Sequence, residues 1–320
     1  MRIANIAVPS PATRSFRLPL PVMVAAFCLL WSSAFAAAKL SIADCPPLIV
    51  LTARFLIAGA VTFAAAAIVG LPLRLRRRDF LVFALLGIAN QAIFLGLSYV
   101  GIRSTSSGLA ALIVSSNPVL TAVLAAAFLN ERMTWRKATG LLLGVAGVAF
   151  VVESRLTGSV DHPIGIAFLL VALVSLVGGT ILYKKLAPTG DLWSGLWVGN
   201  GVQSLAAGLA ILPFAFAFES MGDIVPSWRL AISLAYLGLF VSVFAYLIWF
   251  HLLNVSGATA ASSYHFLMPP LGLLFGWLLL GEQVALTDLI GIVPVAIGIY
   301  LVTRPASARP RARSRTVQCG

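Results

Sequence analysis

The feature that most constrains this chain is a succession of ten apolar runs, each long enough to cross a lipid bilayer as a helix. A hydrocarbon core of about 30 Å needs roughly 20 apolar residues in helical conformation. Only short polar segments separate the runs, which leaves no room for a separate catalytic domain. The runs cover residues 17–39, 46–70, 80–101, 106–129, 135–152, 164–182, 192–218, 230–253, 258–280 and 284–303.

The composition agrees with a membrane-embedded chain. Of 320 residues, 60% are hydrophobic and 10% are charged, with a mean hydropathy of +1.00, whereas soluble domains are about 25% charged. The sequence therefore predicts an all-α integral membrane protein. A net charge of +12 would raise nucleic acid as a partner, but such binding needs a basic face on a soluble surface. We expect no nucleic-acid partner and interpret the basic residues as topology signals.

Basic residues are enriched in the loops on one side of the membrane. With the amino terminus in the cytoplasm, 17 of the 22 Lys and Arg residues fall on the cytoplasmic side, and one more, Arg54, lies within the second run. Positive charge marks cytoplasmic loops, so both termini are expected there, in a bacterial-type inner (plasma) membrane. The four residues assigned to the exterior are Lys39, Arg103, Arg155 and Arg229.

The first run has an alternative interpretation as a cleaved signal peptide. Arg14 and Arg17 precede an apolar stretch that contains the small-residue site Ala34-Phe35-Ala36, which is a signal-peptide pattern. The run continues to Lys39, however, and the repeat described next needs it as a member.

An internal repeat relates the two halves of the chain. A shift of 151 residues places four residues of the fourth and fifth runs on identical residues of the ninth and tenth: Pro118, Glu131, Gly140 and Gly147 on Pro269, Glu282, Gly291 and Gly298. Five runs is an odd number, so the second half must be inverted in the membrane. We expect ten transmembrane helices in two inverted five-helix repeats, 17–155 and 163–303, with cytoplasmic tails at 1–16 and 304–320. Secondary transporters have this architecture, with a substrate site near the midplane.

These residues resemble a known family. The chain is similar to the EamA-type transporters of the drug/metabolite transporter superfamily over about Leu18 to Val302. The resemblance implies a ten-helix inner-membrane carrier, often an exporter of amino acids or related metabolites. This chain departs from the pattern at Met268 and at Gly178-Gly179. The motifs that carry the resemblance are Trp31-Ser32-Ser33 with Lys39, Arg54-Phe55, Ala110 through Pro118 to Asn130-Glu131, and Ala260 through Pro269 to Gly281-Glu282, with the four repeat glycines.

The sequence gives no sign of enzymatic chemistry or of a cofactor. No Gly-Lys pair exists for a Walker A motif, and HExxH and GxSxG are absent. The three cysteines, Cys28, Cys45 and Cys319, have neither metal-site nor disulfide spacing. We therefore expect gradient-driven or facilitated transport without a cofactor or metal.

Polar residues within the apolar runs are the candidates for the substrate site, because burying them has to be offset by packing or by function. Arg54 is interpreted as an anchor for a substrate carboxylate or a gate partner; the alternative is a side chain that snorkels or bonds backbone carbonyls. Asn117, Tyr264 and His265 stand beside proline breaks, where a simple kink is the alternative. His265 is the candidate for proton coupling, although a lone buried His is more often structural.

The other candidates are amides and one aromatic residue. Asn90 and Gln91 lie in the third run, and Asn200 and Gln203 share a helix face in the seventh; they are interpreted as substrate ligands or as helix–helix glue. Trp31 lies mid-run, as a cavity wall or as plain packing. No Asp or Glu lies deep in a run, which favours a neutral, zwitterionic or anionic small molecule over an organic cation. The expected function is a secondary exporter; the alternative is a passive channel or a scaffold.

Overall fold

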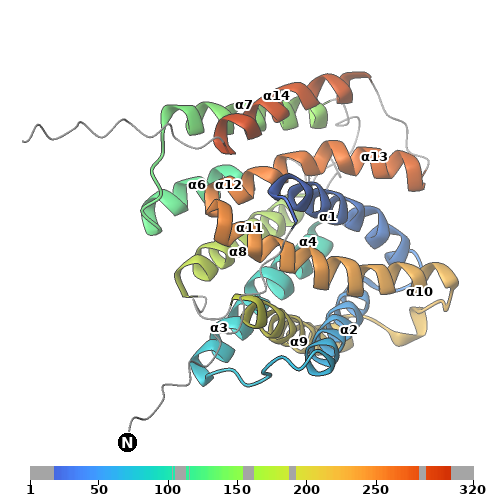
Figure 1. Ribbon diagram of the computed structural model, residues 1–320. Helices are drawn as coiled ribbons and strands as arrows, with labels where there is room; N and C mark the ends of the chain where they lie inside the picture. The colour runs from blue at the N-terminus through green and yellow to red at the C-terminus, as the bar shows by residue number, and fades with distance from the viewer. Residues whose placement is uncertain are drawn as a thin grey trace, which may run out of the picture.

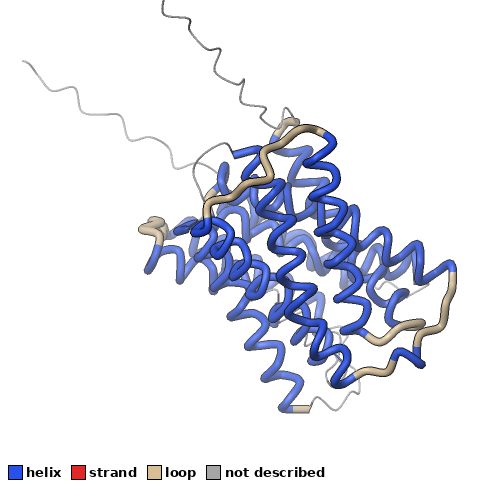
Figure 2. Tube along the Cα trace, turned by 90° about the horizontal axis from the view of Figure 1, so that it is seen from below, coloured by secondary structure: helices blue, strands red, loops and turns tan. Residues whose placement is uncertain are grey.

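The computed structural model describes residues 18–102, 104, 113–114, 116–153, 162–186, 192–280 and 286–303, and all regular structure in these ranges is helical (Figure 2). Both tails, Arg103, Arg155 and Glu282 lie outside the described residues. The helices are α1 (Leu20–Ile42), α2 (Pro47–Ile68), α3 (Arg77–Gly87), η1 (Ile88–Ile93), α4 (Phe94–Ile102), α6 (Asn117–Phe128), α7 (Trp135–Glu153), α8 (Pro163–Leu186), α9 (Leu192–Phe218), η2 (Met221–Asp223), α10 (Trp228–Ala235), η3 (Tyr236–Ala245), α11 (Tyr246–Ser256), α12 (Ala258–Ser263), η4 (Tyr264–Leu267), α13 (Met268–Leu280) and α14 (Leu286–Thr303).

Each of the ten predicted apolar runs contains helix in the described residues. Six helical segments there are long and apolar enough to cross a membrane: Leu20–Ile42, Pro47–Ile68, Arg77–Gly101, Pro163–Leu186, Gly195–Phe218 and Trp228–Ser256. Two more, Asn117–Phe128 and Val293–Thr303, are apolar but shorter. The prediction of an all-helical membrane protein is confirmed, while the count of ten spans stays a prediction.

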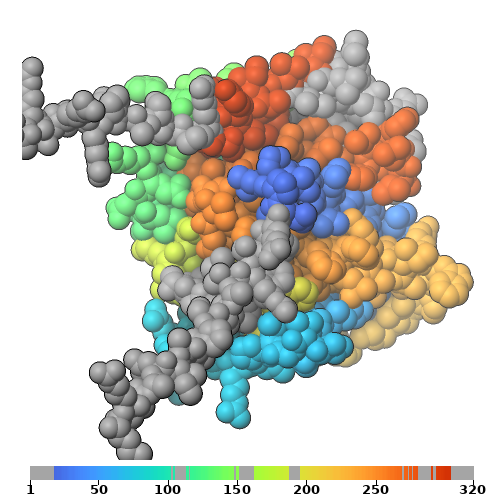
Figure 3. Space-filling model, in the orientation of Figure 1, coloured from blue at the N-terminus to red at the C-terminus, as the bar shows by residue number. Residues whose placement is uncertain are grey.

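Helices far apart in sequence pack side by side. In Figure 1, α7 and α14 lie together at the top of the bundle, and α2 and α9 lie close together near the bottom. Helix α1 packs against α13 and η3, and its blue surface is seated among orange segments in Figure 3. The first and last thirds of the chain therefore share one interior.

Glycines bring α7 and α14 into backbone contact. A Cβ on Gly140 would lie 2.7 Å from the carbonyl oxygen of Gly298, and one on Gly298 would lie 2.5 Å from that of Gly140. Gly144 extends the contact, because its amide nitrogen would lie 2.8 Å from that same Gly298 Cβ. Small residues let helices approach closely in lipid. This close packing stabilises helix association there, because burying apolar surface does not favour it in an apolar solvent.

The contact between α2 and α9 is reciprocal. A Cβ on Gly59 would lie 2.5 Å from Cδ2 of Leu205, and one on Gly208 would lie 2.9 Å from Cδ2 of Leu56. The same interval of 149 residues separates Leu56 from Leu205 and Gly59 from Gly208. In each helix, a leucine packs on the glycine of the other helix, and the two leucine–glycine contacts are at equivalent positions.

Two glutamates join the halves by capping helix starts. The carboxylate of Glu131, after α6, accepts hydrogen bonds from the backbone amides of Ala258 (2.8 Å) and Thr259 (3.3 Å) at the start of α12. Glu219, after α9, accepts them from Leu48 (3.0 Å) and Ile49 (2.9 Å) at the start of α2. A carboxylate at a helix amino terminus satisfies free N–H groups and complements the helix dipole.

Candidate functional site

Two π-helical segments occur among the described helices, and the first of them carries two of the predicted polar residues. Segment η1 carries Asn90 and Gln91, and η3 carries Ser242. π-Helices are rare and often mark functional sites, because the wider turn leaves carbonyl groups for other partners. Here the Ala89 carbonyl accepts a hydrogen bond from Ser175 Oγ at 2.9 Å. The carbonyl of Ser242 accepts one from Asn200 Nδ2 at 3.0 Å.

Arg54 is a buried cation that is bonded to neutral side chains. Its side chain is 3% exposed, and its Nε donates to Ser242 Oγ at 2.7 Å. The guanidinium carbon lies 5.3 Å from the Phe55 ring centroid, and the Tyr99 hydroxyl is close enough for hydrogen bonding. Within the described ranges, no Asp or Glu forms an ion pair with it. Snorkelling, the alternative interpretation, does not fit so low an exposure.

Ser242 connects Arg54 to Asn200. Its hydroxyl bonds the arginine of α2 while its carbonyl bonds the amide of α9. One turn along, the Tyr246 hydroxyl donates to the carbonyl of Asn90 at 3.5 Å. The structure therefore brings Arg54, Asn200 and the η1 segment into one polar group.

Amides around this group have unused hydrogen-bonding capacity. Asn90, Gln91, Asn200 and Gln203 are at most 3% exposed. Both amide atoms of Asn90, Gln91 and Gln203 lack a hydrogen-bond partner, as does Asn200 Oδ1. An unsatisfied buried group costs about 1–3 kcal/mol, so four such amides in one region are a strong sign of a ligand or bound water.

Gly179 explains the departure at Gly178-Gly179 noted in the sequence. A Cβ at Gly179 would collide with the amide of Asn90. Ser33 of α1, which a shift of 146 residues places on Gly179, instead shares a hydrogen bond with the Tyr236 hydroxyl at 2.6 Å. Loss of the side chain on α8 thus creates the space that Asn90 occupies.

An aromatic cluster adjoins the polar group through Tyr246. Trp31, 8% exposed, lies 5.0 Å from Tyr246 and 5.8 Å from His265 between ring centroids. The His265 ring also meets Phe27 (5.6 Å) and Trp249 (4.8 Å) edge to face. Its Nδ1 lies 3.2 Å from the Ser262 carbonyl, and its Nε2 has no hydrogen-bond partner.

The two remaining candidates are Asn117 and Tyr264. Asn117 begins α6, with Pro118 in the first turn, and its Oδ1 accepts a hydrogen bond from Thr121 within the same helix (2.9 Å). Its Nδ2 is buried without a partner. Tyr264 begins the 3₁₀ segment η4, and its carbonyl lies 3.8 Å from Cys28 Sγ. Among the described residues, the hydrogen bonds of Asn117 and Tyr264 do not reach the Arg54 group, while Tyr264 packs in the same buried core as Tyr246.

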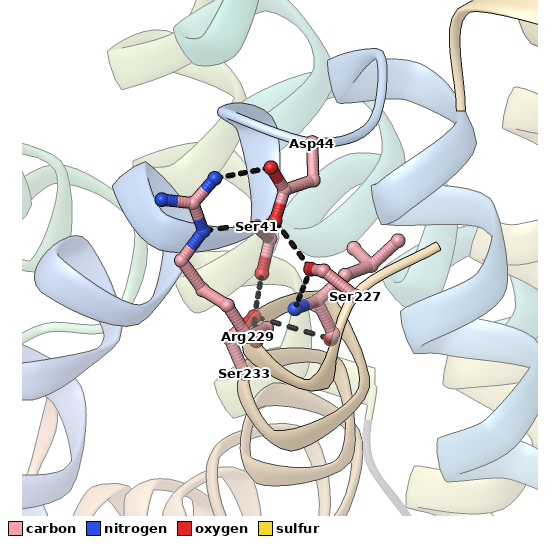
Figure 4. Close-up of polar contacts among 6 residues, drawn as sticks. Ser41, Asp44, Ser227, Arg229 and Ser233 are labelled. Atoms are coloured by element: carbon pink, nitrogen blue, oxygen red, sulfur yellow. Dashed lines mark hydrogen bonds and ion pairs between the residues drawn. The ribbon is translucent and has the colours of Figure 1, made fainter. Parts of the chain in front are cut away.

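A second charged cluster, which we call the Asp44 clasp, closes the end of the bundle at the α1–α2 turn. The Asp44 carboxylate forms a two-point ion pair with Arg229 and accepts a hydrogen bond from Ser227 (Figure 4). Arg229 and Ser227 lower the pKa of Asp44 to about 2. Below the clasp, Ser41 donates to Ser233 at 2.8 Å. The clasp therefore fastens α1 to the start of α10.

Sequence reasoning missed Ser242, Tyr99, Tyr246 and the Asp44 clasp. Ser242 had a detectable signal, since it is the one hydroxyl between Leu237 and Ala245. For Asp44 and Arg229 the signal was weaker, namely opposite charges in two loops that the charge pattern assigns to the same side.

Long apolar helices with polar side chains turned inward define a multi-pass membrane protein. The family model for the EamA-like transporter family matches residues 20–153 and 163–304. The chain therefore belongs to the EamA-like transporter family, as the sequence resemblance predicted.

Relatives agree with this membership. An uncharacterized transporter of Archaeoglobus fulgidus is 31% identical over 286 residues, 88% of this chain and 98% of its own. The uncharacterized transporter YvbV of Bacillus subtilis is 30% identical, covering 91% and 93%. The uncharacterized inner membrane transporter YedA of Escherichia coli is 26% identical, covering 90% and 92%. A crystal structure of a protein with 20% identity superposes with a TM-score of 0.74 over 88% of this chain and 95% of that chain, which shows the same fold.

Proposed function

We propose that this membrane transporter is a secondary carrier that exports a small metabolite, such as an amino acid or a derivative, by alternating access. The observation that carries the proposal is the buried polar group formed by Arg54, Ser242 and Asn200 with the unpaired amides beside it. Lipid cannot satisfy such groups. A polar small molecule that binds among them can.

The substrate-binding residues in this proposal are Arg54, Asn90, Gln91, Asn200 and Gln203, with Trp31 and His265 in the adjoining aromatic cluster and Asn117 and Tyr264 further along the route. The Arg54 guanidinium pairs with no carboxylate in the part of the chain that the structure describes, which favours an anionic or zwitterionic substrate. It disfavours an organic cation, which would need a buried counter-charge. His265 is the candidate for proton coupling because its Nε2 has no partner in the structure.

Inverted repeats are the architecture that fits the helix contacts. The equal interval from Leu56 to Leu205 and from Gly59 to Gly208 is what a two-fold axis between α2 and α9 would produce. The mutual approach of Gly140 and Gly298 fits the same axis. In this proposal the repeats are 17–155 and 163–303, and transport rocks one against the other.

The orientation in the membrane has its own test. Both termini are proposed to be cytoplasmic. The membrane is proposed to be an inner membrane, which the name of the relative YedA also gives. Reporters fused after Arg315 or within residues 74–79 should report cytoplasm, and one near Gly222 should report the exterior. An external carboxyl terminus would contradict both the orientation and the count of ten spans.

Counterflow in proteoliposomes tests the carrier function itself. A metabolite found enriched in the medium of overexpressing cells is loaded inside, and uptake of its labelled form is measured. A carrier shows uptake that the internal substrate stimulates, because loaded sites return faster than empty ones. A channel shows flux without this stimulation, and a scaffold shows none.

A further inference from the structure

Arg54 and Gln203 occupy equivalent places in α2 and α9. The interval of 149 residues that links Leu56 to Leu205 and Gly59 to Gly208 also links Arg54 to Gln203. Because the two glycine contacts are reciprocal in the structure, this equivalence rests on geometry as well as on sequence.

The glycines that contact Arg54 and Gln203 from neighbouring helical segments are also equivalent. A Cβ on Gly238 would lie 3.5 Å from the carbonyl oxygen of Arg54, while one on Gly87 would collide with the backbone of Gln203. Gly87 and Gly238 differ by 151 residues, the interval of the sequence repeat. Four residues after each glycine, about one helical turn on, stand Gln91 and Ser242. The Arg54–Ser242 pair thus has Gln203 and Gln91 as its counterpart.

These two polar pairs lie near each other. Asn200, one turn before Gln203 on the same helix, bonds the Ser242 carbonyl at 3.0 Å. The Tyr246 hydroxyl, one turn after Ser242, reaches the Asn90 carbonyl at 3.5 Å, next to Gln91. The hydrogen bonds of Ser242 and Tyr246 therefore connect the Arg54–Ser242 pair to both elements that carry the amide pair, α9 with Gln203 and η1 with Gln91.

The pairs differ in charge. Arg54 supplies a permanent cation, whose natural partner at membrane depth is a carboxylate. Gln203 and Gln91 supply only amides, fully buried, with donor and acceptor atoms unpaired. An amide pair matches a carboxamide or a hydroxyl, which offers both a donor and an acceptor. A second carboxylate there would be buried without a counter-charge.

We infer that the substrate carries one carboxylate, which binds Arg54, and at its other end a neutral hydrogen-bonding group such as an amide or hydroxyl, which binds Gln203 and Gln91. The inference rests on the proposed carrier function and specifies its substrate class. Both dicarboxylates and fully neutral diamides are selected against by the unequal charge of the two pairs.

Three probes of one carbon skeleton test this inference: succinamate with one carboxylate and one amide, succinate with two carboxylates, and succinamide with two amides. Each is titrated, with its longer homologues, against the purified full-length protein, and the dissociation constant is taken from the rise in unfolding temperature. At the best chain length we expect the monoamide to bind roughly tenfold tighter than either symmetric probe, as a charge-assisted bond predicts.

Matched variants then move the charge. Gln203→Arg should shift the preference to the diacid, and Arg54→Gln to the diamide, each by roughly tenfold. The double variant Arg54→Gln with Gln203→Arg should restore preference for the monoamide, because it only exchanges the two ends. Gln203→Leu, which adds no charge, should bring no gain for the diacid.

Equal binding of the three probes, binding of none at any chain length, or a Gln203→Arg protein that still rejects the diacid would overturn the inference. The ranking in the unmodified protein decides the question even if a variant fails to fold. Counterflow distinguishes this failure from that of the carrier proposal. If counterflow is stimulated but the three probes do not rank as expected, the carrier proposal stands and the substrate class is rejected. If the probes rank as expected but counterflow is not stimulated, the substrate class stands and the carrier proposal is rejected.

Discussion

Gly140 and Gly298 touch backbone to backbone, each placed where a Cβ would reach within 2.7 Å of the other's carbonyl oxygen. Through this contact α7 and α14 form a pair at one edge of the bundle (Figure 1). The sequence repeat matches Gly147 to Gly298 and Gly140 to Gly291. The two glycines that touch therefore do not occupy equivalent positions in the repeat.

Filling this contact should destabilise the protein. Gly140→Leu forces α7 away from α14, and overpacking of this kind costs about 1–3 kcal/mol. We expect a lower unfolding temperature in detergent. Gly96→Ala is the control, because a Cβ there meets nothing within 4 Å and alanine favours helix. An unfolding temperature that does not change in Gly140→Leu would show that the helices can separate at no cost.

Removing the cap at Glu131 should loosen the start of α12. Glu131→Ala leaves the amides of Ala258 and Thr259 without their acceptor, and loss of a cap costs about 1 kcal/mol. Amide hydrogen exchange should rise at these residues. Asp223→Asn, which changes an exposed acid at the end of η2, serves as the control, and equal exchange in both variants would exclude the capping role.

Breaking the Asp44 clasp should open this end of the bundle. Ser41 is fully buried below the clasp, so a cysteine placed there in a background without native cysteines reacts slowly with an impermeant maleimide. Asp44→Asn removes the carboxylate charge that Arg229 binds, and labelling of Ser41→Cys should become several-fold faster. If the rate is the same with and without Asp44→Asn, the clasp does not control access.

The clasp should be insensitive to pH in the physiological range. The pKa of Asp44 is lowered to about 2, below its ordinary value near 3.9. The stabilisation it gives is therefore fully present above about pH 4 and is lost only as the pH falls through about 2. The difference in unfolding temperature between the unmodified protein and Asp44→Asn should stay constant from pH 5 to pH 8. A difference that shrinks by pH 5 would mean that the ion pair is weaker than its geometry indicates.

Substrate flux should depend on the polar side chains along the proposed route. Replacing Arg54, Asn117 or His265 singly by Leu keeps the interior apolar and removes the polar head. We expect Arg54→Leu to lose most of the counterflow, because removing one partner of a charge-assisted bond costs about 1.5–3 kcal/mol. Arg54→Lys should retain part of it. Unchanged flux in all three Leu variants, at normal expression, would favour simple packing roles.

Sequence alone predicted the helices better than the contacts. The positions of the helices follow from apolar length, whereas the sequence left open whether Arg54 is buried or snorkels, and its 3% exposure comes from the structure. The π-helices could not be predicted, because one added residue per turn leaves hydropathy unchanged. The role of Ser242 follows from the structure of η3, where its hydroxyl accepts a hydrogen bond from Arg54 and its carbonyl accepts one from Asn200. Asn117, by contrast, stands beside a proline break in the sequence, and in the structure it accepts a hydrogen bond from Thr121 of its own helix.

The π-helix η3 also restricts which length changes this chain can tolerate. A π-turn accommodates one residue more than an α-turn, so deleting a residue between Tyr236 and Val241 could be absorbed by reversion to α-helix without breaking the helix. The residues after the deletion would keep the faces that they present now, whereas a deletion in plain α-helix would rotate everything after it by about 100°. The wide turn itself would be lost. In this segment, a homologue shorter by one residue would therefore keep its apolar faces and lack the wide turn from which Ser242 bonds Arg54 and Asn200.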